Sequence, residues 1–565
     1  MNFKEFNYYR PDLASISKNI DSLLVEFEKA GNAKSQMEII DKVNEIRNDF
    51  NTQRSIAGVK YTQDTTNADY QAEQDFFDEL SPAFLGLEVK FYETISRSKF
   101  KQDLILKYGN QLFSVAQMTV DTFSDSIVEE LQKENQLGSE YTKLLGSAKI
   151  KFDNKELNLS ELGSYLNSKD RTIRKAANEA KYNFFSSNKI ELDRLFDDLV
   201  KVRASIAKKL GFNNFVELGY KRMLRGDYNA QMVSDYRDQV KKYIVPLTEK
   251  LAEKQAKRIG LDKLYYYDEA LSFKSGNAVP KGSPDWIVDN AKKMYSELSP
   301  ETGEFFQFMT QNELLDLESR SGKAVGGYCT YFSNYKSPFI FSNFNGTAHD
   351  IIVLTHEAGH AFQGFCSRKF DVPEYNFPTY EACEIHSMSM EFLTWPWMDL
   401  FFKEDTDKFK YSHVAKSLIF LPYGVAVDEF QHWIYENPNV TSTERNAQWR
   451  KIEQKYIPYR NYDDNKYLED GGYWQQQRHI YESPFYYIDY TLAQICAFQF
   501  WKKFNQNKKE AMSDYLELCK AGGSKSFLEL VEIANIDSPF KEGCLESVAT
   551  EVNNWLLQVD DSRLN

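Results

Sequence analysis

One five-residue segment constrains the chain most: His356-Glu357-Ala358-Gly359-His360. Residues four apart on an α-helix lie on one face, so both imidazoles can reach a single metal ion. Glu357 lies beside them, where it can act as a general base toward water on that ion. The pattern therefore predicts a helix that carries two metal ligands and a base. The alternative is the polar edge of an amphipathic helix, on which these residues share no role.

The residues around this motif predict the helix itself and a strand before it. The segment from Thr347 to Asp350 has the pattern of a capping box, with Thr347 as the N-cap. Apolar residues then recur every three or four positions from Ile351 to Phe365. Upstream, residues 337–344 have the character of a strand that ends in a turn. A strand edge can hold an extended peptide while a metal polarises its carbonyl, so this arrangement suits a zinc peptidase.

A catalytic zinc site usually takes three protein ligands and leaves a fourth position for water. Downstream of the motif, residues 380–391 have helical character and place Glu381, Glu384 and Glu391 near one face. Spacing alone does not choose among these glutamates and His386. At least one of the four is expected to be an ordinary surface group.

Residues 478–494 form a segment rich in tyrosine that also contains His479. Tyr487 and Tyr490 are three residues apart and are expected to share a helix face. A tyrosine hydroxyl near a metal can donate a hydrogen bond to the oxyanion of a tetrahedral intermediate. Aromatic packing is the alternative role for these rings.

Composition narrows the classes of partner and the compartment. The net charge of -14 argues against nucleic acid and anionic membranes as partners. The six cysteines form no C-x-x-C pair, so neither a thiolate metal site nor a redox motif is expected. We find no signal peptide and no uninterrupted apolar stretch that could span a membrane, so a cytoplasmic location is expected. All seven histidines lie from His349 onward, which confines imidazole chemistry to the C-terminal part.

Helical periodicity dominates the rest of the chain. Residues 1–145 are helix-rich in pattern, and helical patterns resume at 170–211 and 230–259. Residues 150–159 alternate around a turn and predict a small hairpin. Residues 271–287 are rich in Ser, Gly and Pro and predict a loop. These patterns indicate a mainly α fold.

Together the motifs resemble the oligoendopeptidase F family, which is related to the thimet oligopeptidases. Residues 349–363 look like the zinc motif of that family, 384–391 its third-ligand segment and 484–490 its tyrosine segment. The resemblance implies one zinc ion per chain. Its implied ligands are His356, His360 and Glu384, with Glu357 as general base and acid. It further suggests Tyr490, Tyr487 and His479 as contacts to the substrate or the transition state.

One departure from the family pattern is visible. Position 363 is Gln, where some relatives carry a third histidine, so an imidazole ligand is excluded there. The zinc motif itself is intact. Two imidazoles and a carboxylate favour zinc, although cobalt or manganese could also serve.

The resemblance also implies an architecture and an activity. It implies a mainly α, two-lobed fold with a small β-sheet at the active site and a deep substrate channel. We expect residues 1–200 to form a helical N-terminal lobe, with a hairpin near 148–160, and residues 201–565 a zinc catalytic lobe. The predicted activity is hydrolysis of internal peptide bonds in short unfolded oligopeptides. The alternatives are a zinc carboxypeptidase or dipeptidase on the same scaffold, or a non-catalytic peptide-binding relative.

Overall fold

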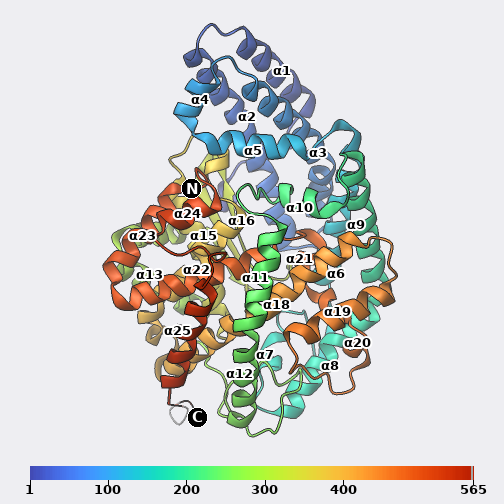
Figure 1. The fold of residues 1–565 in the computed structure, drawn as a ribbon, viewed down its shortest axis with the longest axis vertical. Helices are drawn as coiled ribbons and strands as arrows, with labels where there is room; N and C mark the ends of the chain where they lie inside the picture. Colours follow the sequence, from blue (N-terminus) through green and yellow to red (C-terminus); the bar gives the residue numbers. More distant parts are fainter. Residues whose placement is uncertain (561–563, 565) are drawn as a thin grey trace.

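The computed structural model describes residues 1–560 and 564, and the chain in this range is mainly helical (Figure 1). The predicted mainly α fold is therefore confirmed. Strands within the same range form two small sheets, one of two strands and one of three. None of the helices in the described residues combines the length and the apolar character that a membrane span requires.

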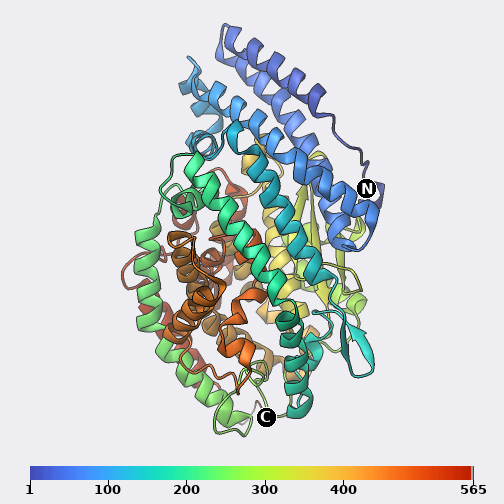
Figure 2. The same ribbon diagram turned by 90° about the vertical axis from the view of Figure 1, so that its right-hand side faces the viewer.

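Long helices build the N-terminal part, drawn in blue in Figures 1 and 2. The side chains of Asp12, Asn32 and Asn67 accept backbone N–H groups at the starts of the first three helices, which fixes where each helix begins. Their inner faces share one apolar core. The helices are α1 (Leu13–Lys29), α2 (Ala33–Gln63), α3 (Ala68–Ser96), α4 (Lys101–Tyr108), α5 (Asn110–Asp121) and α6 (Val128–Gly146).

The predicted hairpin follows α6. Strands β1 (Ile150–Phe152) and β2 (Lys155–Leu157) pair antiparallel. Asp153 and Asn154 connect them with φ angles of 51° and 57°, in the left-handed region that Asp and Asn tolerate in two-residue turns. The hairpin prediction is therefore confirmed.

A second group of helices follows the hairpin and includes those predicted at 170–211 and 230–259. The predicted loop at 271–287 is too long, because Ser283 accepts the N–H of Trp286 and starts a helix at Pro284. The helices are α7 (Gly163–Leu166), α8 (Arg171–Ser187), α9 (Lys189–Lys209), α10 (Phe215–Arg222), α11 (Ala230–Tyr243), α12 (Val245–Arg258), α13 (Pro284–Leu298) and α14 (Pro300–Gln311).

A three-stranded sheet leads into the motif helix. Its central strand, β5 (Ser337–Phe344), has the bounds that the sequence predicts. Strand β4 (Tyr328–Phe332) pairs antiparallel with β5 and lies at one edge of the sheet. Strand β3 (Leu315–Glu318) pairs parallel with β5 on the other side. The edge strand β4 therefore has one side that no strand in the described residues covers.

Among the remaining helices, α16 has side chains that are almost all buried. It packs against α15 and α22. Contact with α15 is so close that a Cβ on Gly359 would lie 2.6 Å from the carbonyl oxygen of His386. The helices are α15 (His349–Ser367), α16 (Tyr380–Leu393), α17 (Asp399–Phe402), α18 (Thr406–Glu436), α19 (Ser442–Tyr456), α20 (Lys466–Glu469), α21 (Arg478–Glu482), α22 (Tyr487–Gln506), α23 (Lys508–Ala521), α24 (Phe527–Ile533) and α25 (Cys544–Gln558).

A cavity of about 730 Å³ lies between the N-terminal helices and the elements around the motif. Helices α2, α3 and α6 contribute to one wall, and β4 and α21 to another. We call it the central cavity, and its lining includes Arg54, Tyr61, Asp78, Glu134, Tyr328 and Arg478. The division into lobes at residue 200 stays a prediction.

Candidate active site

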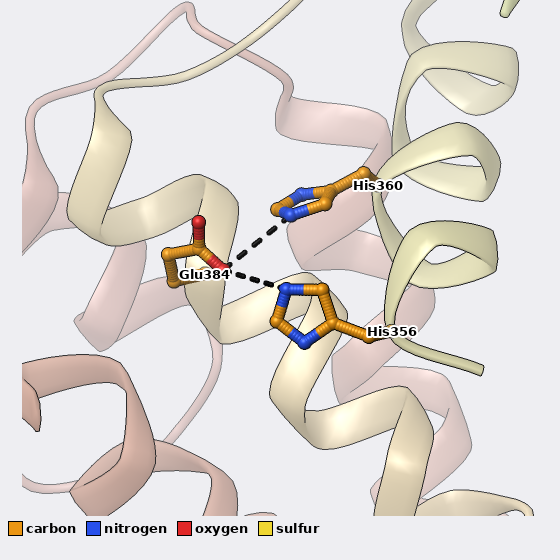
Figure 3. A group of neighbouring side chains, drawn as sticks. All are labelled: His356, His360 and Glu384. Carbon is orange, nitrogen blue, oxygen red and sulfur yellow. Dashed lines mark ion pairs between the residues drawn. The ribbon is translucent and has the colours of Figure 1, made fainter. Parts of the chain in front are cut away.

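Helix α15 presents both motif histidines on one face. The ring centroids of His356 and His360 are 5.1 Å apart, and both side chains point toward a neighbouring helix (Figure 3). The predicted N-cap at Thr347 is wrong. The hydroxyl of Thr347 donates instead to Oδ1 of Asn345, while the carboxylate of Asp350 accepts the N–H groups of the turn before the helix. The turn thus uses the side chains that a capping box would need.

Helix α16 brings Glu384 to the two histidines. Its Oε2 lies 3.1 Å from Nε2 of His356 and 3.4 Å from Nε2 of His360. One potential ligand atom from each of the three residues lies within 4.8 Å of the others (Figure 3). Burial alone raises the pKa of Glu384, but the two histidines outweigh it and hold this pKa well below its usual range.

The other candidates on α16 lie elsewhere. Glu381 is buried near Asp489, and its pKa is raised far above the usual range by burial and by that carboxylate. His386 is fully buried, with Nδ1 2.7 Å from the carbonyl oxygen of Ala382, and burial lowers its pKa to about 4. Glu391 approaches His356 from the opposite side of the ring, at Nδ1. Of the four candidates, the structure therefore brings only Glu384 to Nε2 of both motif histidines.

A chain of hydrogen bonds holds the ring of His356. Its Nδ1–H donates to Oε1 of Glu391 at 2.8 Å, and Nε2–H of His413 donates to Oε2 at 2.6 Å. The indole of Trp395 donates to Nδ1 of His413 at 2.9 Å, which keeps the His413 proton on Nε2. In its neutral form His356 therefore carries its proton on Nδ1 and has a lone pair on Nε2, the atom that faces Glu384. No sequence motif pointed to His413, which lies on α18.

Glu357 lies inside the site without a partner for one oxygen. Its side chain is buried, and Oε2 makes no hydrogen bond with any described residue. Burial raises its pKa, and His356 and His360 oppose the shift. The other oxygen lies beside Gly327, where an added Cβ would come within 3.2 Å of it. Because Gly327 directly precedes β4, the carboxylate lies next to the edge strand.

The tyrosine segment forms a second side of the site. Tyr423 donates to the amide oxygen of Gln477, and the amide nitrogen of Gln477 lies 2.9 Å from Nδ1 of His479. Nε2 of His479 lies 3.0 Å from the hydroxyl oxygen of Tyr490. Burial lowers the pKa of His479 to about 4, so the ring is neutral near pH 7. In this arrangement Nε2–H of His479 donates to Tyr490, which leaves the Tyr490 proton to be donated within the site.

Two further tyrosines of this segment, Tyr486 and Tyr487, make different kinds of contact. The hydroxyl of Tyr486 donates to Oε1 of Glu384, a contact that the sequence did not single out. Its four-residue spacing from Tyr490 is the signal that could have found it. The ring of Tyr487 contacts Tyr423 and Tyr490, with centroids 5.6 Å and 5.5 Å away. The structure thus brings Tyr486 and Tyr490 close to the histidine and glutamate cluster and places Tyr487 among aromatic rings.

These residues fit a divalent metal ion of the zinc class. Two imidazole nitrogens and one carboxylate oxygen converge, as in catalytic zinc sites. The carboxylate of Glu391 on the far nitrogen of His356 is the partner that metal-bound histidines usually have. The unpartnered oxygen of Glu357 lies beside the same cluster, where a water molecule would need a base.

Protein-family models match two parts of the chain. The peptidase M3 N-terminal domain matches residues 3–123, and peptidase family M3 matches residues 164–276 and 297–550. An oligoendopeptidase F homologue of Borreliella burgdorferi is 26% identical over 66% of this chain, a match that spans 63% of that relative's own length. Oligopeptidase PepF of Bacillus subtilis is 22% identical over 90% of this chain and 79% of its own.

Solved structures extend the likeness to the whole chain. PZ peptidase A, solved with an inhibitor, is 56% identical and superimposes with a TM-score of 0.99 over 99% of this chain and 100% of its own. A Bacillus anthracis protein assigned to oligoendopeptidase F is 55% identical, with a TM-score of 0.95 over 100% of this chain and 99% of its own. This chain therefore belongs to peptidase family M3 and, within it, to the oligoendopeptidase F family that its motifs resemble.

Proposed function

We propose that this chain is a zinc-dependent endopeptidase that hydrolyses internal bonds of short, unfolded oligopeptides. The observation that carries the proposal is the convergence of Nε2 of His356, Nε2 of His360 and Oε2 of Glu384 beside the unpartnered carboxylate oxygen of Glu357. The names of the relatives, oligoendopeptidase F and oligopeptidase, support oligopeptides as the substrate class. In this proposal residues 1–200 form the N-terminal lobe and residues 201–565 the catalytic lobe.

Two features of the structure support an extended peptide as the substrate. The central cavity is lined by Tyr328, Cys329 and Thr330 of the edge strand β4. A peptide that pairs with this edge would offer its main chain to the strand and its carbonyls to the adjacent site. Helices α2, α3 and α6 line the opposite side of this cavity, so an extended segment would lie between them and β4.

His356, His360 and Glu384 would hold the zinc ion. When bound, the ion supplies Lewis-acid chemistry that lowers the pKa of water from 15.7 to about 7 and polarises a carbonyl. Oε2 of Glu357 takes the proton from the attacking water and passes it to the leaving amine. Its raised pKa, due chiefly to burial, makes this carboxylate a stronger base than an exposed one.

Tyr490 would stabilise the oxyanion. Its hydroxyl oxygen is held by Nε2–H of His479, so its own O–H can donate to the developing negative charge. Because His479 stays neutral near pH 7, it orients Tyr490 without adding a charge. Tyr487, the third predicted contact, would line the aromatic wall beside Tyr423 and interact with substrate side chains.

The variant Glu357→Gln tests the proposal. The amide cannot take a proton from water, so we expect at least about a hundredfold loss of turnover. Metal content and thermal stability should stay close to wild type, because Glu357 is not one of the three ligands. Glu38→Gln, an exposed change on α2, is the matched control and should keep full activity. Hydrolysis by Glu357→Gln at the wild-type rate would rule out the proposed mechanism.

A further inference from the structure

The central cavity is lined by four arginines, three of which are already paired. They are Arg54, Arg203, Arg222 and Arg478. Arg203 and Arg222 share the carboxylate of Glu134, at 2.6 Å and 2.8 Å. Arg478 pairs with Glu482 one helical turn away. These three guanidinium groups therefore have their charge partners within the protein.

Arg54 differs from the other three. It lies on α2 with its side chain exposed, and it makes no hydrogen bond or ion pair with any residue in 1–560 or with 564. Its pKa is nevertheless lowered, chiefly because protein surrounds the guanidinium, and Glu88 and Tyr380 only partly oppose this shift. The carboxylate of Glu88 is itself bound to Arg47 at 2.9 Å. Arg54 is thus a cation on the wall of a recess, open to water and free to bind an anion.

Two observations place Arg54 near the candidate active site. The same cavity is lined by Cys329 of β4, two residues after Gly327, where an added Cβ would lie 3.2 Å from an oxygen of Glu357. Tyr380, which influences the pKa of Arg54, has its ring 5.1 Å from that of Tyr486. The hydroxyl of Tyr486 in turn donates to Glu384. Arg54 therefore lines a cavity whose β4 side adjoins the candidate site.

The charge of the cavity is opposite to that of the chain. Four arginines face three carboxylates, those of Asp78, Glu134 and Glu482, and burial raises the pKa of Asp78 to about 6. The lining is therefore locally positive in a chain with a net charge of -14. A positive group in a cleft concentrates an anionic ligand there.

We propose that Arg54 binds a carboxylate of the peptide substrate and so determines which peptides enter productively. The carboxylate is either the C-terminal one or an acidic side chain, since a guanidinium recognises both by the same paired hydrogen bonds. This inference rests on the proposed function and deepens it. The peptide residues between that carboxylate and the scissile bond would then run from Arg54 along β4 to the candidate site.

Four peptides of one sequence separate the two sources of the carboxylate. They combine a free or an amidated C-terminus with Glu or Gln at one internal position. The metal-loaded full-length protein is compared with Arg54→Gln and with Arg54→Lys. Arg97→Gln is the matched control, because the side chain of Arg97, the C-cap of α3, is 78% exposed. We expect Arg54→Gln to lower kcat/KM about tenfold for peptides that carry the recognised carboxylate, mainly through KM. Arg54→Lys should retain part of the effect, and Arg97→Gln should change nothing.

The pattern of losses identifies the source. A loss that disappears on amidation assigns the C-terminal carboxylate, and one that disappears with Gln assigns the side chain. An equal loss with all four peptides, or no loss with any, would overturn the inference. Because Arg54 makes no hydrogen bond or ion pair with the described residues, thermal unfolding should not change.

A binding measurement separates this inference from the proposed function. Fluorescein-labelled versions of the four peptides are titrated into metal-loaded Glu357→Gln, which should not turn them over, and into Glu357→Gln with Arg54→Gln. The inference predicts about tenfold weaker Kd in the double variant, only for peptides with the recognised carboxylate. Unchanged Kd would overturn it even if wild type cleaves peptides. A carboxylate-dependent Kd together with no cleavage by wild type would refute the proposed function alone.

Discussion

Replacing Glu391 by glutamine should weaken metal binding although none of the three proposed ligands is altered. Glutamine keeps the shape of the side chain but offers one acceptor oxygen and one NH₂ donor. The indole of Trp395 donates to Nδ1 of His413, so His413 must keep its proton on Nε2 and needs the acceptor oxygen. The NH₂ group is then left to face Nδ1 of His356.

The Glu391→Gln change affects Nε2 of His356, the nitrogen that would bind the metal. To accept a hydrogen bond at Nδ1, His356 must move its proton to Nε2, the atom 3.1 Å from Glu384. A protonated nitrogen cannot bind a metal. Metal binding must therefore reverse the tautomer against an unfavourable contact. Loss of such a partner weakens metal affinity by about 10–100-fold, or about 1.4–2.8 kcal/mol.

Competition with a chromophoric chelator measures this affinity in wild type, Glu391→Gln and the double variant with Trp395→Phe. Phenylalanine cannot donate to His413, so His413 can shift its proton to Nδ1 and accept from the amide. The double variant should therefore recover part of the lost affinity. Thermal unfolding of the metal-free proteins controls for stability. Wild-type affinity in Glu391→Gln, or no recovery in the double variant, would refute the reasoning.

Two further predictions concern packing and pH. Gly359→Ala should destabilise the fold by about 1–3 kcal/mol, because its Cβ would lie 2.6 Å from the carbonyl oxygen of His386. The control is Gly31→Ala, which should be neutral because an added Cβ there meets nothing within 4 Å. Equal melting temperatures for the two variants would contradict this prediction. His432 is buried, and burial is the main reason that its pKa is lowered to about 4. Arg237 and Arg225 also lower this pKa, while Asp428 raises it. The unfolded chain binds this proton from about pH 6.5, so wild type should lose up to about 3 kcal/mol of stability as the pH falls from 6.5 to 4. His432→Gln should remove that part of the pH dependence in denaturant titrations, and an unchanged slope would contradict the assignment.

Local patterns in the sequence were sufficient for the elements that carry the site. Helix α15 could be predicted because the spacing of the two histidines and the apolar periodicity both indicate a helix between Ile351 and Phe365. Strand β5 and the small hairpin follow from β-type residues bounded by turns. The start of α15 could not be predicted, because the hydroxyl of Thr347 is taken by Asn345, and a capping pattern does not reveal such competition.

Tertiary contacts decide the rest of the site. Glu381, Glu384 and Glu391 share one helix, and only their neighbours distinguish the carboxyl buried near Asp489, the candidate ligand and the partner of His356. These neighbours come from α15, α18 and α22, which no local pattern relates to α16. The resemblance to a known family singled out Glu384 because the family carries that tertiary information. Arg54, on α2, has no sequence signal at all.

Cleavage of one end-blocked peptide by metal-free and by zinc-reloaded protein tests the central claim most directly. The protein is stripped with a chelator, elemental analysis verifies that it holds no metal, and one equivalent of zinc per chain is then returned. We predict no cleavage by the stripped protein and internal cleavage after zinc is restored, with one ion bound per chain. Cleavage by verified metal-free protein at the wild-type rate, or no cleavage of the blocked peptide after reloading, would contradict a zinc-dependent endopeptidase.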